Sequence, residues 1–349
     1  MKIVELRCAD LAKAVTFIIH EIKSFRGEDV CFDVMYKIYT WLFIDNPLRR
    51  EDFIGWGLVD AEGELRGTHL ICWEDYSMGQ KHIRLLVSTN SYVQEAFRGP
   101  IGLGLMLNMR RKVGVDVCIC TTANVNSGSI WKSLKANVLS RSDAETIIGM
   151  NPQGLICEKL ASSCNSSLIR NFYRIVSPLR RLMRRKISSD YNCCQILETE
   201  LNSIATPLNV DRFAPHRNSE YLQWRYFLHP SSNTMLYRVG DGQGNECYVG
   251  ICLRKRGKLE LTCAYLLDLF GDYQTMHFES ILGAIDKATH NAADFFSLRL
   301  HLFEKFTPEK HWLCKTREME FPTHWGLSLN KDISITDCSL MMCSGDAVV

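Results

Sequence analysis

The chain has 349 residues, of which 46% are hydrophobic, and a formal net charge of +2 at pH 7. This length suits two domains with ample cores, and the near-neutral charge gives no general drive toward nucleic acid. No apolar run reaches the ~20 residues of a membrane span, and charges within the first ten residues disfavour a secretory signal, so we expect a cytoplasmic protein without a transmembrane segment.

The first part of the sequence alternates short apolar segments with helical patterns. In chain order we expect a strand (2–6), helices (10–22 and 34–42), strands (55–59, 66–73 and 85–93), a helix after residue 104, a strand (115–120), a helix (127–134) and a closing strand pair (146–149 and 154–160). Helices alternating with mostly antiparallel strands and one central crossover predict a mixed α/β fold, a twisted sheet flanked by helices.

The most informative segment is the turn after the expected strand over 85–93. It reads Phe97-Arg98-Gly99-Pro100-Ile101-Gly102-Leu103-Gly104. Such a turn can direct several backbone N–H groups to one point, where the helix dipole adds partial positive charge, so it can hold a phosphate or pyrophosphate. Glycines before a helix also serve plain chain reversal, and the sequence leaves both interpretations open.

The next strand supplies a second signal. Its apolar run over 115–120 suits a buried strand, and Thr121-Thr122-Ala123-Asn124 ends it with polar residues before a helix. Asn124 is either a helix cap or a contact to a ligand.

These two segments resemble the GCN5-related N-acetyltransferases (GNAT), whose acyl-CoA pyrophosphate loop follows the fourth strand and whose next strand is followed by an asparagine. The spacing departs from the usual family motif: counted from Arg98, its glycine positions fall on Ile101 and Leu103. Backbone amides tolerate such drift, and the looser pattern is similar to divergent members found among bacterial surface-polysaccharide genes. The resemblance implies an acyl-CoA-dependent N-acyltransferase, using acetyl-CoA or another acyl-CoA, with an amine acceptor such as an amino sugar of a polysaccharide precursor.

The resemblance also implies site residues. The cofactor would contact Val87, Ser88, Arg98, Gly99, Ile101, Gly102, Leu103, Gly104 and Asn124, with a backbone N–H near Val87 or Ser88 facing the thioester carbonyl. The candidate bases are Glu74, Asp75 and His69, on or just beyond the preceding strand. The tyrosine that serves the family as general acid is replaced by Trp131, whose indole N–H does not ionise usefully.

The second half of the sequence repeats features of the first. Three pairs share one offset: Trp41 and Trp224, Pro47 and Pro230, Gly67 and Gly250. Each Trp–Pro segment is followed by a hairpin-like pattern, so the chain is interpreted as a duplication.

The expected organisation is therefore tandem. We expect a GNAT-like acyl-CoA-binding domain over 1–165, a basic amphipathic linker over 166–190, and a second, degenerate GNAT-like domain over 191–349. No Arg-Gly turn precedes the expected helix over 276–291, and Asp272 and Glu279 would repel a phosphate there. The second domain would complete the acceptor cleft or buttress the fold.

The linker combines an apolar stripe with arginines. Leu168, Phe172 and Ile175 recur at helical spacing among the cations of the segment Arg170 to Lys186. One interpretation is peripheral contact with an anionic membrane or a phosphate-bearing acceptor. The other, which we favour, is a helix whose apolar stripe packs inward while its arginines stay solvated.

The chain has 15 cysteines but no Cys-x-x-Cys pair, and six of them lie in apolar runs: Cys72, Cys118, Cys120, Cys157, Cys252 and Cys263. We interpret these as small buried hydrophobes and expect no metal site. Two other functions stay open: a Fem-like aminoacyl transferase that uses charged transfer RNA, and a non-catalytic GNAT-like binding or scaffold protein.

Overall fold

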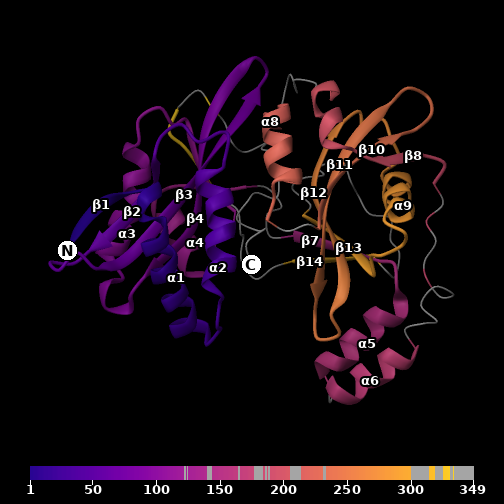
Figure 1. Cartoon of the computed structure of the whole chain (residues 1–349), viewed down its shortest axis with the longest axis horizontal. Coiled ribbons are helices and arrows are strands. Elements are labelled where there is room, and N and C mark those ends of the chain that lie inside the picture. The colour runs from indigo at the N-terminus through magenta and orange to yellow at the C-terminus, as the bar shows by residue number, and fades with distance from the viewer. Residues whose placement is uncertain are drawn as a thin grey trace. The chain divides into compact units, whose positions relative to one another are not determined.

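A computed structural model gives the fold and describes residues 1–121, 123, 125–139, 144–163, 166–176, 184, 187, 189–204, 214–230, 233–299, 314–318, 325–330 and 333. The chain divides into two compact units (Figure 1). Unit 1 comprises Met1–Asp143, Leu208–Pro230 and Glu320–Val349, and unit 2 comprises Ala144–Pro207 and Ser231–Met319.

Unit 1 is built on a mixed sheet with the strand order β1-β2-β3-β4-β5-β15-β6, in which β9 pairs with β3 off this path. The strands are β1 (Lys2–Arg7), β2 (Phe53–Val59), β3 (Leu65–Met78), β4 (Lys81–Val93), β5 (Val117–Cys120), β6 (Asn137–Val138), β9 (Ala214–Pro215) and β15 (Trp325–Ser328). All described pairs are antiparallel except β4 and β5, which run parallel.

Helices cover this sheet. They are η1 (Cys8–Asp10), α1 (Leu11–Arg26), α2 (Phe32–Tyr39), the π-helical turn η2 (Thr40–Ile44), η3 (Glu95–Phe97), α3 (Pro100–Leu107), η4 (Asn108–Arg111), α4 (Val125–Ser133), α8 (Ser219–Leu222) and a second π-helical turn, η7 (Gln223–Phe227). Leu105 of α3, Met109 of η4 and Trp131 of α4 are buried in one core with Trp56 and Trp73 of the sheet. This packing fixes α3 against β2 and β3.

Unit 2 repeats the pattern with the strand order β14-β7-β13-β12-β11-β10-β8. Its strands are β7 (Ala144–Gly149), β8 (Asn192–Gln195), β10 (Thr234–Gly240), β11 (Glu246–Arg256), β12 (Leu261–Gly271), β13 (Phe295–Arg299) and β14 (Cys314–Glu318). Its helices are α5 (Pro152–Ser163), α6 (Ser166–Val176), η6 (Glu198–Ser203) and α9 (Phe278–Ala288). The parallel pair is β12 with β13, the counterpart of β4 with β5.

Besides β9, which pairs with β3, the sheets exchange one strand each between the two halves of the sequence. β15, near the C-terminus, pairs with β5 and β6 of unit 1. β7, which follows β6 in sequence, instead pairs with β13 and β14 of unit 2. The two sheets therefore have the same strand order with their equivalent strands exchanged.

The predicted duplication has a local structural counterpart. Trp41 lies in η2 and Trp224 in η7, and their rings stack with centroids 4.6 Å apart. Trp41 Nε1 donates to the Trp224 carbonyl at 2.9 Å, and Trp224 Nε1 donates to the Trp41 carbonyl at 2.8 Å, at a separation of 183 residues. π-Helical turns are rare, so a matching pair with reciprocal contacts supports the offset seen in the sequence.

The structure differs from the expected boundaries. Continuous domains over 1–165 and 191–349 were expected, but strand exchange makes both units discontinuous, and β7, α5 and α6 belong to unit 2. The mixed α/β class with two sheets is confirmed.

One expected strand, 154–160, is wrong: these residues lie in helix α5. Asn151 starts this helix, because its side-chain oxygen accepts from Gly154 N at 3.1 Å and its carbonyl accepts from Leu155 N at 3.2 Å. Pro152 occupies the first turn, where it is favourable. The expected partner of 146–149 is thus replaced by β13 and β14.

The six cysteines assigned to the interior are all buried as free thiols, although Cys157 lies in a helix rather than a strand. Over the residues that the structure describes, no helix has the length and apolar character needed to cross a bilayer.

Candidate functional site

The parallel strands β4 and β5 separate partway along the sheet. They pair only from Leu85 opposite Val117 to Ser88 opposite Cys120. β4 continues to Val93, whereas β5 ends at Cys120. The end of β4, residues 89–93, is flanked by β3 on one side and by no strand on the other within the described chain. One edge of β4 therefore opens after Ser88.

A β-bulge lies at the start of this open edge. Thr89 is opposite Leu70 and Ser91 is opposite His69, so Asn90 is the extra residue. Asn90 has a φ of 42°, in the left-handed region that asparagine tolerates better than most residues. A bulge redirects the main-chain groups of its strand. The N–H groups near Asn90 thus leave the regular ladder where the strands separate.

The start of α3 follows the same strand. Gly99 has a φ of 92°, which favours glycine, and Pro100 opens the helix. The Leu103 N–H donates to the Gly99 carbonyl at 2.9 Å, whereas the N–H groups of Gly99, Ile101 and Gly102 have no hydrogen bond from the described residues. Free N–H groups at a helix N-terminus attract anions.

Arg98 anchors this turn. Its Nε donates to the Val93 carbonyl at 3.2 Å, and its guanidinium lies 4.1 Å from the centroid of the Phe25 ring of α1. The side chain is exposed. Arg98 therefore ties the turn to the end of β4 and adds a positive charge beside it.

The expected cofactor residues differ in their exposure to solvent. Gly99 and Ile101 are exposed at the start of α3, and Gly102, Leu103 and Gly104 are half-buried. Asn124 lies outside the described residues.

The placement of the thioester near Val87 or Ser88 needs correction. Both residues lie between β3 and β5, opposite Cys72 and Ile71 on one side and Ile119 and Cys120 on the other, and both are buried. The sheet offers no open edge there, because β4 and β5 part only after Ser88. The bulge at Asn90 is the first place where one is available.

Two of the three candidate bases lie far from the bulge. Glu74 is opposite Leu85 and Asp75 is opposite Arg84, so both lie at least roughly 15 Å along the strand from the bulge. A base must come within hydrogen-bond reach of its proton. Glu74 is also buried, with 1% of its surface exposed.

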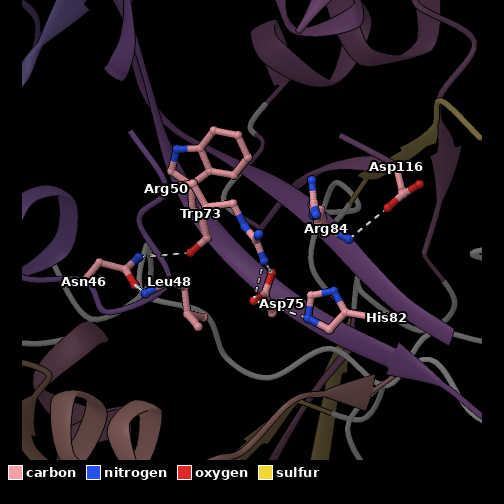
Figure 2. A network of polar contacts seen from close by, with 8 residues as sticks. All are labelled: Asn46, Leu48, Arg50, Trp73, Asp75, His82, Arg84 and Asp116. Atoms are coloured by element: carbon pink, nitrogen blue, oxygen red, sulfur yellow. Dashed lines mark hydrogen bonds and ion pairs between the residues drawn. The ribbon is translucent and has the colours of Figure 1, made fainter. Parts of the chain in front are cut away.

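Asp75 instead belongs to a polar network, which Figure 2 shows. Arg50 Nη2 lies 3.1 Å and His82 Nε2 3.3 Å from Asp75 Oδ2. Nearby, Asn46 Nδ2 donates to the Trp73 carbonyl at 2.9 Å. These contacts join the loop after η2 to the β3–β4 hairpin, so Asp75 has a structural role.

His69 is the one expected base that lies at the bulge. It is fully buried, and burial lowers the pKa of His69 to about 4, so the ring is neutral near pH 7. Its Nε2 lies 3.1 Å from Met109 Sδ, and its Nδ1 lies 3.1 Å from Ser91 Oγ. A thioether cannot donate, so Nε2 carries the proton and Nδ1 accepts from the Ser91 hydroxyl.

Ser91 is the residue that sequence reasoning missed. It is exposed on the open edge of β4, and its hydroxyl proton is directed at His69. Its oxygen can therefore act only as an acceptor toward the open edge. The pairing with His69 depends on the bulge at Asn90, so only the possibility of a left-handed asparagine was readable in the sequence.

Trp131 cannot replace the family's general acid. It is fully buried in the core of unit 1, and its Nε1 has no hydrogen-bond partner among the residues described.

The corresponding helix of unit 2 offers a poorer anion site. The His277 N–H at the start of α9 donates to the Tyr191 hydroxyl at 3.0 Å, and Glu279 lies in the first turn. The carboxylate of Asp272 approaches the Glu246 N–H at 3.4 Å. Two carboxylates near this terminus disfavour a bound phosphate.

No protein-family model matches the chain, and no curated protein matches its sequence. Two solved structures resemble it over 94% of its length, each with a TM-score of 0.54. One is a probable N-acyltransferase of unknown function from Enterococcus faecalis, at 8% identity and 72% of that chain. The other is a GCN5-related N-acetyltransferase from Anabaena variabilis, at 10% identity and 73% of that chain. The chain has the fold of this class of proteins.

Proposed function

We propose that the chain is an acyl-CoA-dependent N-acyltransferase, with acetyl-CoA or another acyl-CoA as cosubstrate. The observation that carries this proposal is the position of the open, bulged edge of β4 directly before the free N–H groups of α3. The N–H groups of Gly99, Ile101 and Gly102 would bind the diphosphate, and the edge over 89–93 would pair with the pantetheine amides. The shared fold supports this assignment.

The reaction would be direct transfer. The acceptor amine attacks the thioester carbon, a C–N bond forms, and the C–S bond breaks as the CoA thiolate leaves. The proton that the nitrogen loses passes to the thiolate, directly or through solvent, and gives the free CoA thiol. A main-chain N–H near Asn90 would stabilise the oxyanion. Ser91 would accept an N–H of the amine and so direct the nitrogen lone pair at the carbonyl, which makes it a positioning residue.

The acceptor class comes from the sequence resemblance. We propose an amine on a small molecule or an amino sugar of a polysaccharide precursor. Within the described residues, no group of three or more His, Cys, Asp or Glu side chains is placed to hold a metal ion.

A second candidate is favoured by a specific observation. His69 and Glu74 are buried, Asp75 is ion-paired and Trp131 lies in the core, so none of the expected acid–base groups faces the open edge. The same site would then bind acyl-CoA without turnover. Release of free CoA thiol in the presence of amino-sugar acceptors separates the two candidates.

The test of the binding site uses Ile101. This side chain is 41% exposed in the first turn of α3, so substitution should leave the core intact. In Ile101→Glu a carboxylate lies beside the free N–H groups, where it favours the helix but repels a diphosphate. Ile101→Gln has the same shape without the charge and serves as the matched control.

Thermal shift is measured with acetyl-CoA, longer acyl-CoAs and charged transfer RNA. We expect acyl-CoA to raise the unfolding temperature of the parent and of Ile101→Gln, and to leave that of Ile101→Glu unchanged. Stabilisation by charged transfer RNA alone would instead support an aminoacyl transferase. Equal responses of the two variants to acyl-CoA would reject this site.

A further inference from the structure

We propose that an exposed face of α5 and α6 in unit 2 binds the surface of an anionic lipid bilayer. This face, called the apolar face below, consists of Ile156 and Leu160 of α5 and Leu168, Phe172 and Ile175 of α6. The proposal concerns where the protein works and does not depend on the acyl transfer proposed above.

The apolar face is exposed although its helices are packed. Leu168, Phe172 and Ile175 are 68%, 58% and 76% exposed, and their spacing places them on one side of α6. Another side of the same helix, with Ile169 and Tyr173, packs against a buried core of unit 2. The expectation that the stripe packs inward is therefore wrong: α6 has a separate apolar side for the core.

The two helices are held in place by packing against unit 2. α5 and α6 lie side by side at one end of unit 2 (Figure 1). Cys157 and Ala161 of α5 are buried in the same core as Leu259 and Leu261. The apolar face is thus presented on a folded platform.

The charge on α6 is positive. Its charged side chains are Arg170 and Arg174. Residues 166–189 contain seven Arg or Lys and no Asp or Glu, in a chain whose net charge is only +2. Positive charge is therefore concentrated in this segment, while the rest of the chain has an excess of acidic residues.

Neighbouring carboxylates do not cancel this positive charge. The Glu158 carboxylate of α5 accepts from the backbone N–H groups of Lys258 and Leu259 at 2.7 and 2.8 Å. Glu260 lies 3.3 Å from Arg170, but both side chains are largely exposed, so this pair is weak and can give way to a phosphate. Arg184, one of the seven cations counted above, pairs with Asp286 and is buried, so it adds no charge to the surface.

These features fit a lipid surface better than a second copy of the chain. Leu, Phe and Ile on one side of a helix, with arginines beside them, are typical of helices that lie at a membrane interface. Anionic head groups would neutralise the arginines, whereas a second copy would bring two cationic segments together. A lipid surface therefore satisfies both the apolar side chains and the charge.

The test is co-sedimentation with vesicles of phosphatidylcholine alone and with vesicles containing an equal amount of phosphatidylglycerol. The parent should bind the mixed vesicles and lose most binding in high salt. A triple variant, Leu168→Ser with Phe172→Ser and Ile175→Ser, should lose about tenfold or more in partition because its apolar contacts are gone. Val113→Ser, at a 90% exposed apolar residue of unit 1, is the matched control and should bind like the parent.

Thermal unfolding of the triple variant should match that of the parent, since the replaced side chains are exposed. The proposal is overturned if the parent binds neither vesicle, or if the triple variant binds as well as the parent. It is also overturned if the parent forms dimers that the triple variant abolishes, because a second copy would then cover the apolar face.

Discussion

At the residue scale, the candidate site depends on one backbone irregularity. The bulge at Asn90 brings Ser91 opposite His69 and ends the regular pairing of β4. The sequence predicted His69 as a candidate, because it lies on the strand before the expected cofactor strand. It could not predict the partner, because shifting the register by one residue turns every side chain to the other face of the sheet.

The buried His69 gives a prediction for stability against pH. Its folded-state pKa of about 4 lies below the ordinary histidine value of 6.5, so between pH 6.5 and pH 4 the unfolded chain binds a proton that the folded chain does not. The parent should lose about 3 kcal/mol of unfolding free energy from this group between pH 7 and pH 4. His69→Gln should not show that loss. When the free energy of unfolding is measured in urea at a series of pH values, the curves of the parent and of His69→Gln should therefore approach each other as the pH falls from 7 to 4. Parallel curves would contradict a neutral buried imidazole.

Ser91 gives a prediction for catalysis. Ser91→Ala removes the acceptor oxygen at the open edge and leaves the buried His69 Nδ1 without its donor, so the free energy of unfolding should fall by about 1–3 kcal/mol. Under the proposed transferase, turnover should fall about tenfold or more, with little change in acyl-CoA affinity. Steady-state kinetics with a separate acyl-CoA titration measures both. Unchanged turnover would remove Ser91 from the site.

At the element scale, propensity and periodicity predicted that most of the helices and strands exist. Whether a segment formed a helix or a strand was in one case decided by a helix cap. The apolar pattern placed β1, α1, β4 and β5 within a few residues of their observed bounds. The run over 154–160 fits a strand or a helix equally well, and the Asn151–Pro152 cap decided for the helix.

The paired π-helical turns give a prediction at this scale. Trp41→Phe and Trp224→Phe each remove one of two reciprocal hydrogen bonds and weaken one stacked pair. Each substitution should lower the free energy of unfolding by about 1–3 kcal/mol. In a double-mutant cycle measured by urea denaturation, the double variant should lose less than the sum of the two single losses, with a coupling energy of about 1 kcal/mol. Strict additivity would show that the two tryptophans do not act as a pair.

At the scale of the whole molecule, strand exchange is the feature that the sequence did not predict. A short apolar segment such as AETIIG in β7 is compatible with either sheet, because the alternation of its side chains does not determine which strand it pairs with. The sequence predicted a duplication from tryptophan, proline and glycine pairs, since a fixed offset survives when pairing is rearranged, and the equal strand order of the two sheets fits that prediction.

Because of the strand exchange, a substitution in β15 should affect strands of unit 1 that lie far from it in the sequence. Leu327 of β15 is buried in the core of unit 1, although it lies near the C-terminus. Leu327→Ala should cost about 2–4 kcal/mol and speed hydrogen exchange in β4 and β5. Leu228→Ala, at an exposed residue, is the control. Faster exchange confined to the C-terminal peptide would contradict the pairing of β15 with β5.

The most direct measurement of the central claim is hydrogen exchange of backbone amides with and without CoA. If the N–H groups of Gly99, Ile101 and Gly102 bind the diphosphate, a peptide covering 94–107 should exchange more slowly with CoA and not with pantetheine, which lacks the diphosphate. The peptide over 271–280 at the start of α9 should be unaffected. No protection in 94–107, or equal protection at α9, would contradict the assignment of the acyl-CoA site to α3.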